Sequence, residues 1–147
     1  MLILRYFGYL FIFSSISYFA LASEPIGTIG IVIGQADVVN RNIELKIKEN
    51  IYFGDVIKTG AQTNLQILFD DETVFTIGEN TEIVINEFIY DPNQNNELNK
   101  ISAELMRGSL KVVTGLISKE NPENLLITLP TGVLATRGTE VQALVKP

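Results

Sequence analysis

The sequence predicts an all-β fold, and three observations support that prediction. Short runs of residues alternate between apolar and polar side chains, as expected of strands with one buried face. Gly, Pro, Asn or Asp separates these runs, which is typical of turns between strands. No stretch keeps the 3.6-residue periodicity of an amphipathic helix.

The predicted strands follow one another from residue 29 onward. The run 101–107 also contains good helix formers, but strand is favoured because the alternation continues on both sides. A loop is predicted over 91–97, where Pro and successive Asn residues favour turns. The predicted strands are 29–33, 45–48, 65–69, 75–77, 83–85, 101–105, 110–112, 125–129 and 133–135.

Two segments repeat one pattern. Residues 60–67 resemble residues 78–85, displaced by 18 positions, and both carry Gly, Thr and two alternating aliphatic residues at matching places. A period near this length is typical of stacked β-coils, so we predict a β-solenoid-like stack of short strands. The alternative is an antiparallel β-sandwich in which the two segments are similar hairpins.

The first 22 residues are interpreted as a signal peptide. Arg5 gives the positive start, an uncharged apolar run follows it, and Ala20-Leu21-Ala22 matches a cleavage pattern of small residues. Cleavage after Ala22 leaves residues 23–147 as one domain in the periplasm or outside the cell. The alternative is an uncleaved anchor, because about 17 apolar residues just span a bilayer.

Composition narrows the function. Removal of the signal peptide takes away Arg5 and moves the formal charge from −6 to −7, which together with the scattered Lys and Arg argues against nucleic acid as a partner. His and Cys are absent, so the usual catalytic triads, dyads and zinc sites are excluded. We therefore expect no enzyme, no cofactor and no metal site.

Two weaker patterns of chemistry do not change this view. The carboxylates of 70–72 and of Glu120 and Glu123 resemble acid and base pairs, but acids after a strand are usually a solvated turn. Asp91-x-Asn93-x-Asn95 starts like a calcium loop. It has Asn96 where such loops need Gly, and Ser102 where they need a bidentate Glu.

Five phrases in a fixed order resemble the FecR domain family. They cover residues 54–60, 65–73, 77–83, 105–115 and 129–141, the last with an Arg137-Gly138-Thr139 phrase. The resemblance implies a β-rich, solenoid-like periplasmic module, best known in regulators that relay receptor status to a sigma factor. Such regulators also have a cytoplasmic anti-sigma segment, for which the residues before the apolar run are too few, so only the extracytoplasmic module is expected here.

The family-motif residues have simple physical interpretations. Asp55 and Asp70 are predicted to bond backbone amides in turns, and Thr59 and Thr73 to suit strand edges. Arg137 is predicted to clamp carbonyls or a buried carboxylate, with ligand binding as the alternative. Gly60, Gly78 and Gly108 are predicted to take positive φ. The complete set is Gly54, Asp55, Thr59, Gly60, Asp70, Thr73, Gly78, Gly108, Gly115, Arg137, Gly138 and Thr139.

The predicted function is a non-enzymatic sensing or protein-interaction module of the bacterial envelope with a link to signal transduction. Its expected partner is another envelope protein, bound through a strand edge or a face of the β-structure. The alternatives are an envelope glycan-binding protein, which the presence of only Tyr52 and Tyr90 after the signal argues against, and a purely structural protein.

Overall fold

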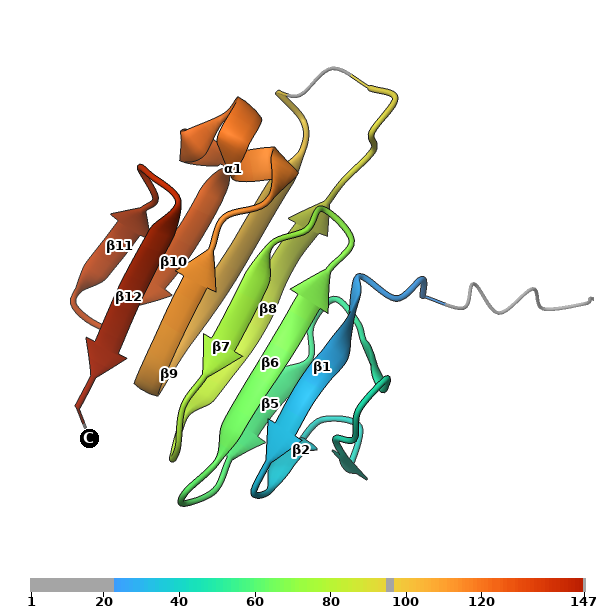
Figure 1. Cartoon of the computed structure of the whole chain (residues 1–147). Helices are drawn as coiled ribbons and strands as arrows, with labels where there is room; N and C mark the ends of the chain where they lie inside the picture. Colours follow the sequence, from blue (N-terminus) through green and yellow to red (C-terminus); the bar gives the residue numbers. More distant parts are fainter. Residues whose placement is uncertain (1–22, 95–96, 147) are drawn as a thin grey trace, which may run out of the picture.

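The computed structural model describes residues 23–94 and 97–146, so the predicted signal peptide lies outside the described residues (Figure 1). The first six strands are β1 (Gly27–Ile33), β2 (Ala36–Val38), β3 (Ile43–Glu44), β4 (Asn50–Ile51), β5 (Val56–Thr59) and β6 (Asn64–Phe69). The next six are β7 (Val74–Ile77), β8 (Glu82–Ile89), β9 (Lys100–Val113), β10 (Leu125–Leu129), β11 (Gly132–Ala135) and β12 (Glu140–Val145). A short helix α1 (Leu116–Glu120) and a 3-10 turn η1 (Pro122–Asn124) lie between β9 and β10.

The strands form one strongly curled sheet that makes a half-barrel (Figure 1). Its first layer has the order β4-β1-β6-β7-β9-β12, and its second layer has the order β3-β2-β5-β8-β9-β10-β11. The long strand β9 belongs to both layers: its first half pairs with β8 and its second half with β7. Every pairing is antiparallel except that of β9 with β10.

The all-β prediction is confirmed, but the structure does not have the predicted solenoid. Solenoid coils stack on their successors, whereas β6 and β8, which carry the 18-residue repeat, do not pair with each other. β6 pairs with β1 and β7, and β8 pairs with β5 and β9. The antiparallel pairing is closer to the sandwich alternative, except that the chain joins both layers into one continuous sheet.

The repeat instead builds two equivalent corners, at which the chain passes from one layer to the other. Gly60 N–H and Thr63 Oγ1 donate to Gln35 O at 2.9 and 3.1 Å, and Gln35 N–H donates back to Thr63 Oγ1. In the second corner Gly78 N–H, Thr81 Oγ1 and Ser109 make the same three contacts. The repeated Gly and Thr therefore fix corners, not coils.

The core lies between the two layers and consists of the alternating apolar residues that the sequence pattern indicated. Ile67 and Phe75 point inward from the first layer, and Ile57, Ile83 and Leu105 point inward from the second, all fully buried. Phe69 stacks on Phe88 and meets Phe75 edge to face. The run 101–107 is part of β9, as the strand interpretation predicted.

The helix α1 was not predicted, because its five residues are too few to show a helical period. Ile117 on this helix is buried against the core. The turn after β6 fixes the start of α1: Leu116 N–H donates to Asp71 O at 2.7 Å, and Ile117 N–H donates to the Asp71 carboxylate at 3.2 Å. In the part of the chain that the structure describes, no helix has the length and apolar character needed to span a bilayer.

Candidate interaction edge

The sheet ends in two very different ways on its two sides. Near the N-terminus the outermost strands are β3 and β4, which are two residues long each. Near the C-terminus the outermost strands are β11 and β12, drawn in red in Figure 1, with four and six residues. We call these the closed side (β3, β4 and residues 39–55) and the open side (β11, β12 and residues 136–139).

Side chains cover the backbone groups of the closed side. The Asn40 side chain accepts from Val56 N–H at 2.9 Å and donates to Gly54 O at 3.1 Å, as a neighbouring strand would. Arg41 donates to Asn50 O on β4 at 3.1 Å and forms two bonds of 2.7 Å with Asp55. These contacts occupy backbone groups of Asn50, Gly54 and Val56, which another chain therefore cannot bond.

The pair of Arg41 and Asp55 is the strongest electrostatic contact of the closed side. Asp55 is buried and also accepts from Tyr52 N–H at 3.0 Å, in agreement with the predicted role of this carboxylate in a turn. Arg41 lies over the Tyr52 ring, 4.8 Å from its centroid. The hydrogen bonds to Asp55 raise the pKa of Arg41. This bidentate clamp was not predicted, because Arg41 and Asp55 are 14 positions apart and carry no common motif.

On the open side, Arg137 does not form the clamp that was predicted for it. Its side chain is exposed, and within residues 23–94 and 97–146 it makes no hydrogen bond or ion pair. The neighbouring Gly138, with a φ of 119°, lies in the exposed link between β11 and β12. Thr139 anchors this link through its carbonyl, which accepts from Thr114 N–H at 2.9 Å. The Thr114 hydroxyl also donates to Gly138 O at 3.1 Å, so Thr114 holds the link and the guanidinium of Arg137 stays in solvent.

The outer edge of β12 has backbone groups directed away from the protein. Because Thr139 O accepts from Thr114 N–H, the register places the N–H and C=O groups of Val141, Ala143 and Val145 toward β9. The alternating groups of Glu140, Gln142 and Leu144 then face outward, and β12 pairs with no strand other than β9 among the described residues. A strand from another chain can add along this edge.

The same argument identifies the outward groups of β11. Thr136 N–H donates to Leu125 O, so Leu134 and Gly132 face β10, whereas Val133 and Ala135 face outward. This second free edge is shorter than that of β12, and the Val133 side chain on it is exposed. β11 therefore supplies a natural comparison for the β12 edge.

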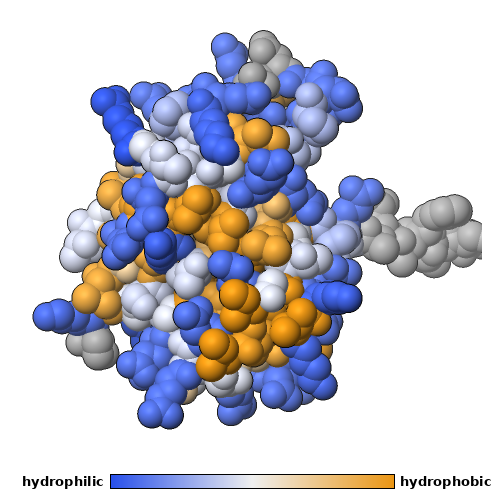
Figure 2. All heavy atoms as spheres, viewed as in Figure 1, coloured by the Kyte–Doolittle hydropathy of each residue, from blue (hydrophilic) through white to orange (hydrophobic). Residues whose placement is uncertain are grey.

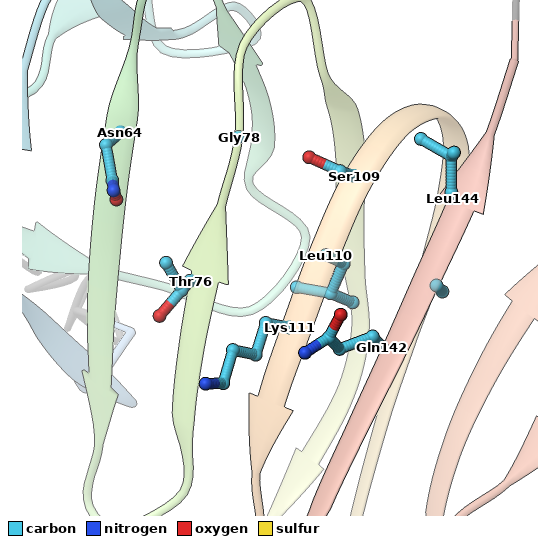
Figure 3. A pocket seen from close by; sticks show the side chains of 9 residues that line it. Asn64, Thr76, Gly78, Ser109, Leu110, Lys111, Gln142 and Leu144 are labelled. Carbon is cyan, nitrogen blue, oxygen red and sulfur yellow. The ribbon is translucent and has the colours of Figure 1, made fainter.

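A shallow groove of about 370 Å³ adjoins β12 on the outer face of the first layer (Figure 3). Thr76, Lys111 and Gln142 lie side by side in register on β7, β9 and β12. Leu144 rises beside the groove, and its side chain is 67% exposed. A second depression lies on the other side of Leu144, and Lys146 is among the residues that line it. The edge thus combines outward backbone groups with an apolar side chain between two depressions.

Charges along β12 have opposite signs at its two ends. Glu140 forms an ion pair of 3.1 Å with Lys111 and accepts from Gln142 at 3.2 Å, and these contacts lower the pKa of Glu140. Lys146, just beyond the strand, is exposed and makes no hydrogen bond or ion pair within the described part of the chain. The side chains of Ala143 and Val145 face inward and pack against the core.

A separate apolar surface lies on the outer face of β1 and β6. Figure 2 shows apolar residues gathered over these strands, where Ile31, Ile33 and Leu68 are 42%, 59% and 40% exposed. This surface is a face of the sheet rather than an edge, and it offers no outward backbone groups.

The turn between β6 and β7 differs from the prediction in the carboxylate that it uses. Asp70 is exposed, and burial of part of its carboxyl group, followed by the charge of Asp71, raises its pKa. Asp71 is instead the fully buried residue, and its carboxylate accepts from Thr73 N–H, Thr73 Oγ1 and Ile117 N–H. Because three bonds occupy this carboxylate, its arrangement is that of a structural turn.

Thr73 also holds the start of α1, because its hydroxyl accepts from Gly115 N–H at 3.1 Å. A Cβ on Gly115 would come within 2.3 Å of Asp71 O and Thr73 N, so the two segments approach as closely as glycine permits. The motif residues Thr73 and Gly115, 42 positions apart, therefore meet in one buried contact.

The remaining motif residues lie at the corners. Thr59 Oγ1 donates to Gly78 O at 2.7 Å and accepts from Thr81 N–H, which ties β5 to the corner after β7.

The positive-φ prediction is right for Gly108, with φ of 92°, and wrong for Gly60 and Gly78. At Gly78 the requirement is space, since a Cβ would lie 2.0 Å from Ser109 Oγ. Gly54 also takes positive φ, 81°, in the turn before Asp55.

These features define a curled β half-barrel with a closed side, where side chains bond backbone groups, and an open side, where β11 and β12 each pair with one strand among the described residues. The family model described as FecR protein matches residues 55–146, and the chain belongs to this family. The family is associated with sigma-factor regulation, generally as a regulator module without catalytic activity. Neither the curated proteins nor the solved structures gave a match to this chain.

Proposed function

We propose that this chain is an exported, non-enzymatic interaction module of the bacterial envelope that binds a strand of a partner protein along β12. The observation that carries the proposal is the six-residue free edge with outward backbone groups at Glu140, Gln142 and Leu144. Main-chain hydrogen bonds along such an edge give affinity, and side chains on alternate positions give specificity.

The contrast with the closed side supports this assignment. Exposed sheet edges invite unwanted pairing, so proteins usually protect them with short strands or covering side chains. Asn40 and Arg41 provide such protection on the closed side. An edge that is long and left uncovered, with exposed Leu144 beside it, is consistent with a binding surface.

The place of action is part of the proposal. Arg5, the apolar run and Ala20-Leu21-Ala22 support export, and the FecR family membership supports a partner that takes part in envelope signalling. Expression of the complete sequence in bacteria, followed by fractionation and N-terminal analysis, tests this part. Recovery in the periplasmic fraction with Ser23 as the first residue is expected, and retention in the cytoplasm with Met1 would contradict export.

Site-specific photo-crosslinking in the intact envelope tests the edge. A photoreactive residue at Leu144 is expected to capture a protein, whereas one at Ile47, which is also exposed but lies on the closed side, is not. Gln142→Pro removes an outward N–H without affecting the bonds between β12 and β9, and should abolish capture. Val133→Pro makes the same change on β11 and should leave capture intact. Equal capture from both positions, or capture that survives Gln142→Pro, would refute the proposal.

A further inference from the structure

The exposed sequence of β12 is complementary to itself when two copies run antiparallel. If Ala143 of one copy lies opposite Ala143 of the other, Glu140 faces Lys146, Val141 faces Val145, and Gln142 faces Leu144. We propose that the partner strand is β12 of a second copy of this chain, related to the first by a two-fold axis at Ala143. This inference rests on the proposed function, because it names the occupant of the same edge.

The outward backbone groups select this arrangement. Glu140, Gln142 and Leu144 direct their N–H and C=O groups away from β9. Lys146 follows β12 directly and continues this alternation in the proposed dimer, where β12 extends by one residue. With Ala143 on the axis, Glu140 lies opposite Lys146 and Gln142 opposite Leu144, so each outward residue meets another outward residue. Antiparallel strands exchange both hydrogen bonds at such pairs. The two copies of the first layer then become one continuous sheet across the axis.

Charge selects the register. A slip of one residue would place outward groups opposite inward-facing ones and break the pairing. A slip of two residues in either direction restores the backbone pairing, but it places Glu140 opposite Leu144 or moves it beyond Lys146. Only the register centred on Ala143 forms two ion pairs, one on each side of the axis. No like charges lie opposite each other in it.

Side chains on both faces fit the same register. On the outer face Leu144, which is 67% exposed, gains cover from Gln142 of the second copy, and the two Leu144 side chains lie diagonally across the axis about 7–8 Å apart. Glu140 contacts Lys111 within its own chain, and Lys146 of the second copy approaches from the free side. On the inner face Val141 and Val145 form a β-branched cross-strand pair on each side of the axis.

The edges of β11, β3 and β4 lack this property. β11 carries no charged residue between Gly132 and Ala135, so nothing fixes a register for its pairing with a second copy. β3 and β4 are two residues long, and Arg41 occupies Asn50 O on β4. Of these four edges, that of β12 is self-complementary and is also the longest.

Sedimentation velocity over a range of concentrations, on protein purified after expression of the complete chain, tests the proposal. The unmodified chain is expected to associate to a dimer. Glu140→Lys places Lys opposite Lys146 at both ends of the interface, and Lys146→Glu places Glu opposite Glu140. Each variant alone is expected to dimerise at least about tenfold more weakly, since two attractions become two repulsions.

Mixing the two variants gives the decisive result. A copy with Lys at 140 and 146 faces a copy with Glu at both positions, so both ion pairs form and a mixed dimer is expected with affinity near that of the unmodified chain. Restored association also shows that each variant is folded. A mixture that associates no better than either variant alone, or a dimer that persists in Gln142→Pro, would overturn the proposal.

Failure of this inference is distinguishable from failure of the proposed function. A chain that stays monomeric at every concentration, while Leu144 still crosslinks to a different envelope protein in a manner abolished by Gln142→Pro, contradicts the second copy and leaves the edge as a docking site. Absence of both dimer and edge-dependent crosslink contradicts both proposals.

Discussion

The closed and open sides of the half-barrel end the same sheet by opposite means. On the closed side, the Asn40 and Arg41 side chains bond backbone groups of Gly54, Val56 and Asn50, and the outermost strands are two residues long. On the open side, β12 keeps six residues, and Arg137 lies in solvent without a hydrogen bond or ion pair in the described part of the chain. The comparison shows that side chains bonded to edge backbone groups prevent a further strand from pairing there. An edge without such side chains can pair with another strand.

The region that the family model matches begins at the end of the closed side. Residues 55–146 include the whole open side, whereas β1 to β4 and the arginine of the Arg41–Asp55 clamp precede the matched region. Asp55, the first matched residue, is thus held by a side chain from outside it. The clamp of Arg41 and Asp55 thus joins the matched region to the part of the half-barrel that the family model does not cover.

Loss of the clamp should produce the largest effect. Arg41→Ala leaves the buried Asp55 carboxylate without its cation, and removing one partner of such a pair destabilises by about 3 kcal/mol. Chemical denaturation monitored by circular dichroism measures this loss. The matched control is Arg137→Ala on the open side, which is expected to leave the midpoint unchanged because no contact is lost. Similar losses in both variants would contradict the distinction between the two sides.

The two corners, which lie between the closed and open sides, should respond alike because the same bonds hold both of them. Thr63→Val leaves Gln35 N–H without its acceptor, and Thr81→Val does so for Ser109 N–H. An unsatisfied buried donor costs about 1–3 kcal/mol, and these two donors are only partly buried, so similar losses at or below about 1 kcal/mol are expected. Thr76→Val, on the outer face of β7, removes a hydroxyl with no protein hydrogen bond among the described residues and should have little effect. Unequal losses of unfolding free energy in the two variants would show that the two corners resemble each other in sequence but not in energetics.

The elements that could be predicted from sequence are those in which a buried face repeats within a short run. Leu65, Ile67 and Phe69 alternate because one side of β6 faces the core, and this pattern is local. The corner residues Thr63 and Thr81 also repeat visibly, but their partners Gln35 and Ser109 lie 28 positions away in opposite directions along the chain. The sequence therefore shows the periodicity but not the architecture that it builds.

The candidate edge was harder to predict for a different reason. The pattern of β12 contains Glu140 and Gln142 outside and only Ala143 and two valines inside, so its hydrophobic signal is weak. Arg137 was assigned the clamp because it precedes a Gly-Thr turn, whereas Arg41, which forms the clamp, lies in a polar turn without a motif. A free edge is a property of the assembled sheet, and no local pattern of residues encodes it.

Hydrogen exchange should separate the inward from the outward groups of the open edge. In dilute protein, the amides of Gln142 and Leu144 should exchange at least about tenfold faster than those of Val141 and Ala143, whose bonds to β9 protect them. NMR-detected exchange measures these rates residue by residue. Protection of Gln142 and Leu144 that grows with protein concentration would indicate that the edge becomes paired. Uniform protection of all four amides in dilute protein would contradict the assigned direction of the backbone groups.

The smallest effect is expected at Asp70, which directly follows β6 and lies on neither of the two sides. Desolvation and the nearby Asp71 raise the pKa of Asp70 above its ordinary value of 3.8, so the fold favours the protonated form. Stability from this group is therefore full below pH 3.8 and is lost as the pH rises through the raised pKa. Asp70→Asn should raise the melting temperature slightly at pH 7, and the gain should disappear in acid. The shift is small because water screens an exposed carboxylate. Glu44→Gln, an exposed carboxylate on β3 with no hydrogen bond or ion pair among the described residues, should give no gain, and a loss of stability in Asp70→Asn at pH 7 would contradict the argument.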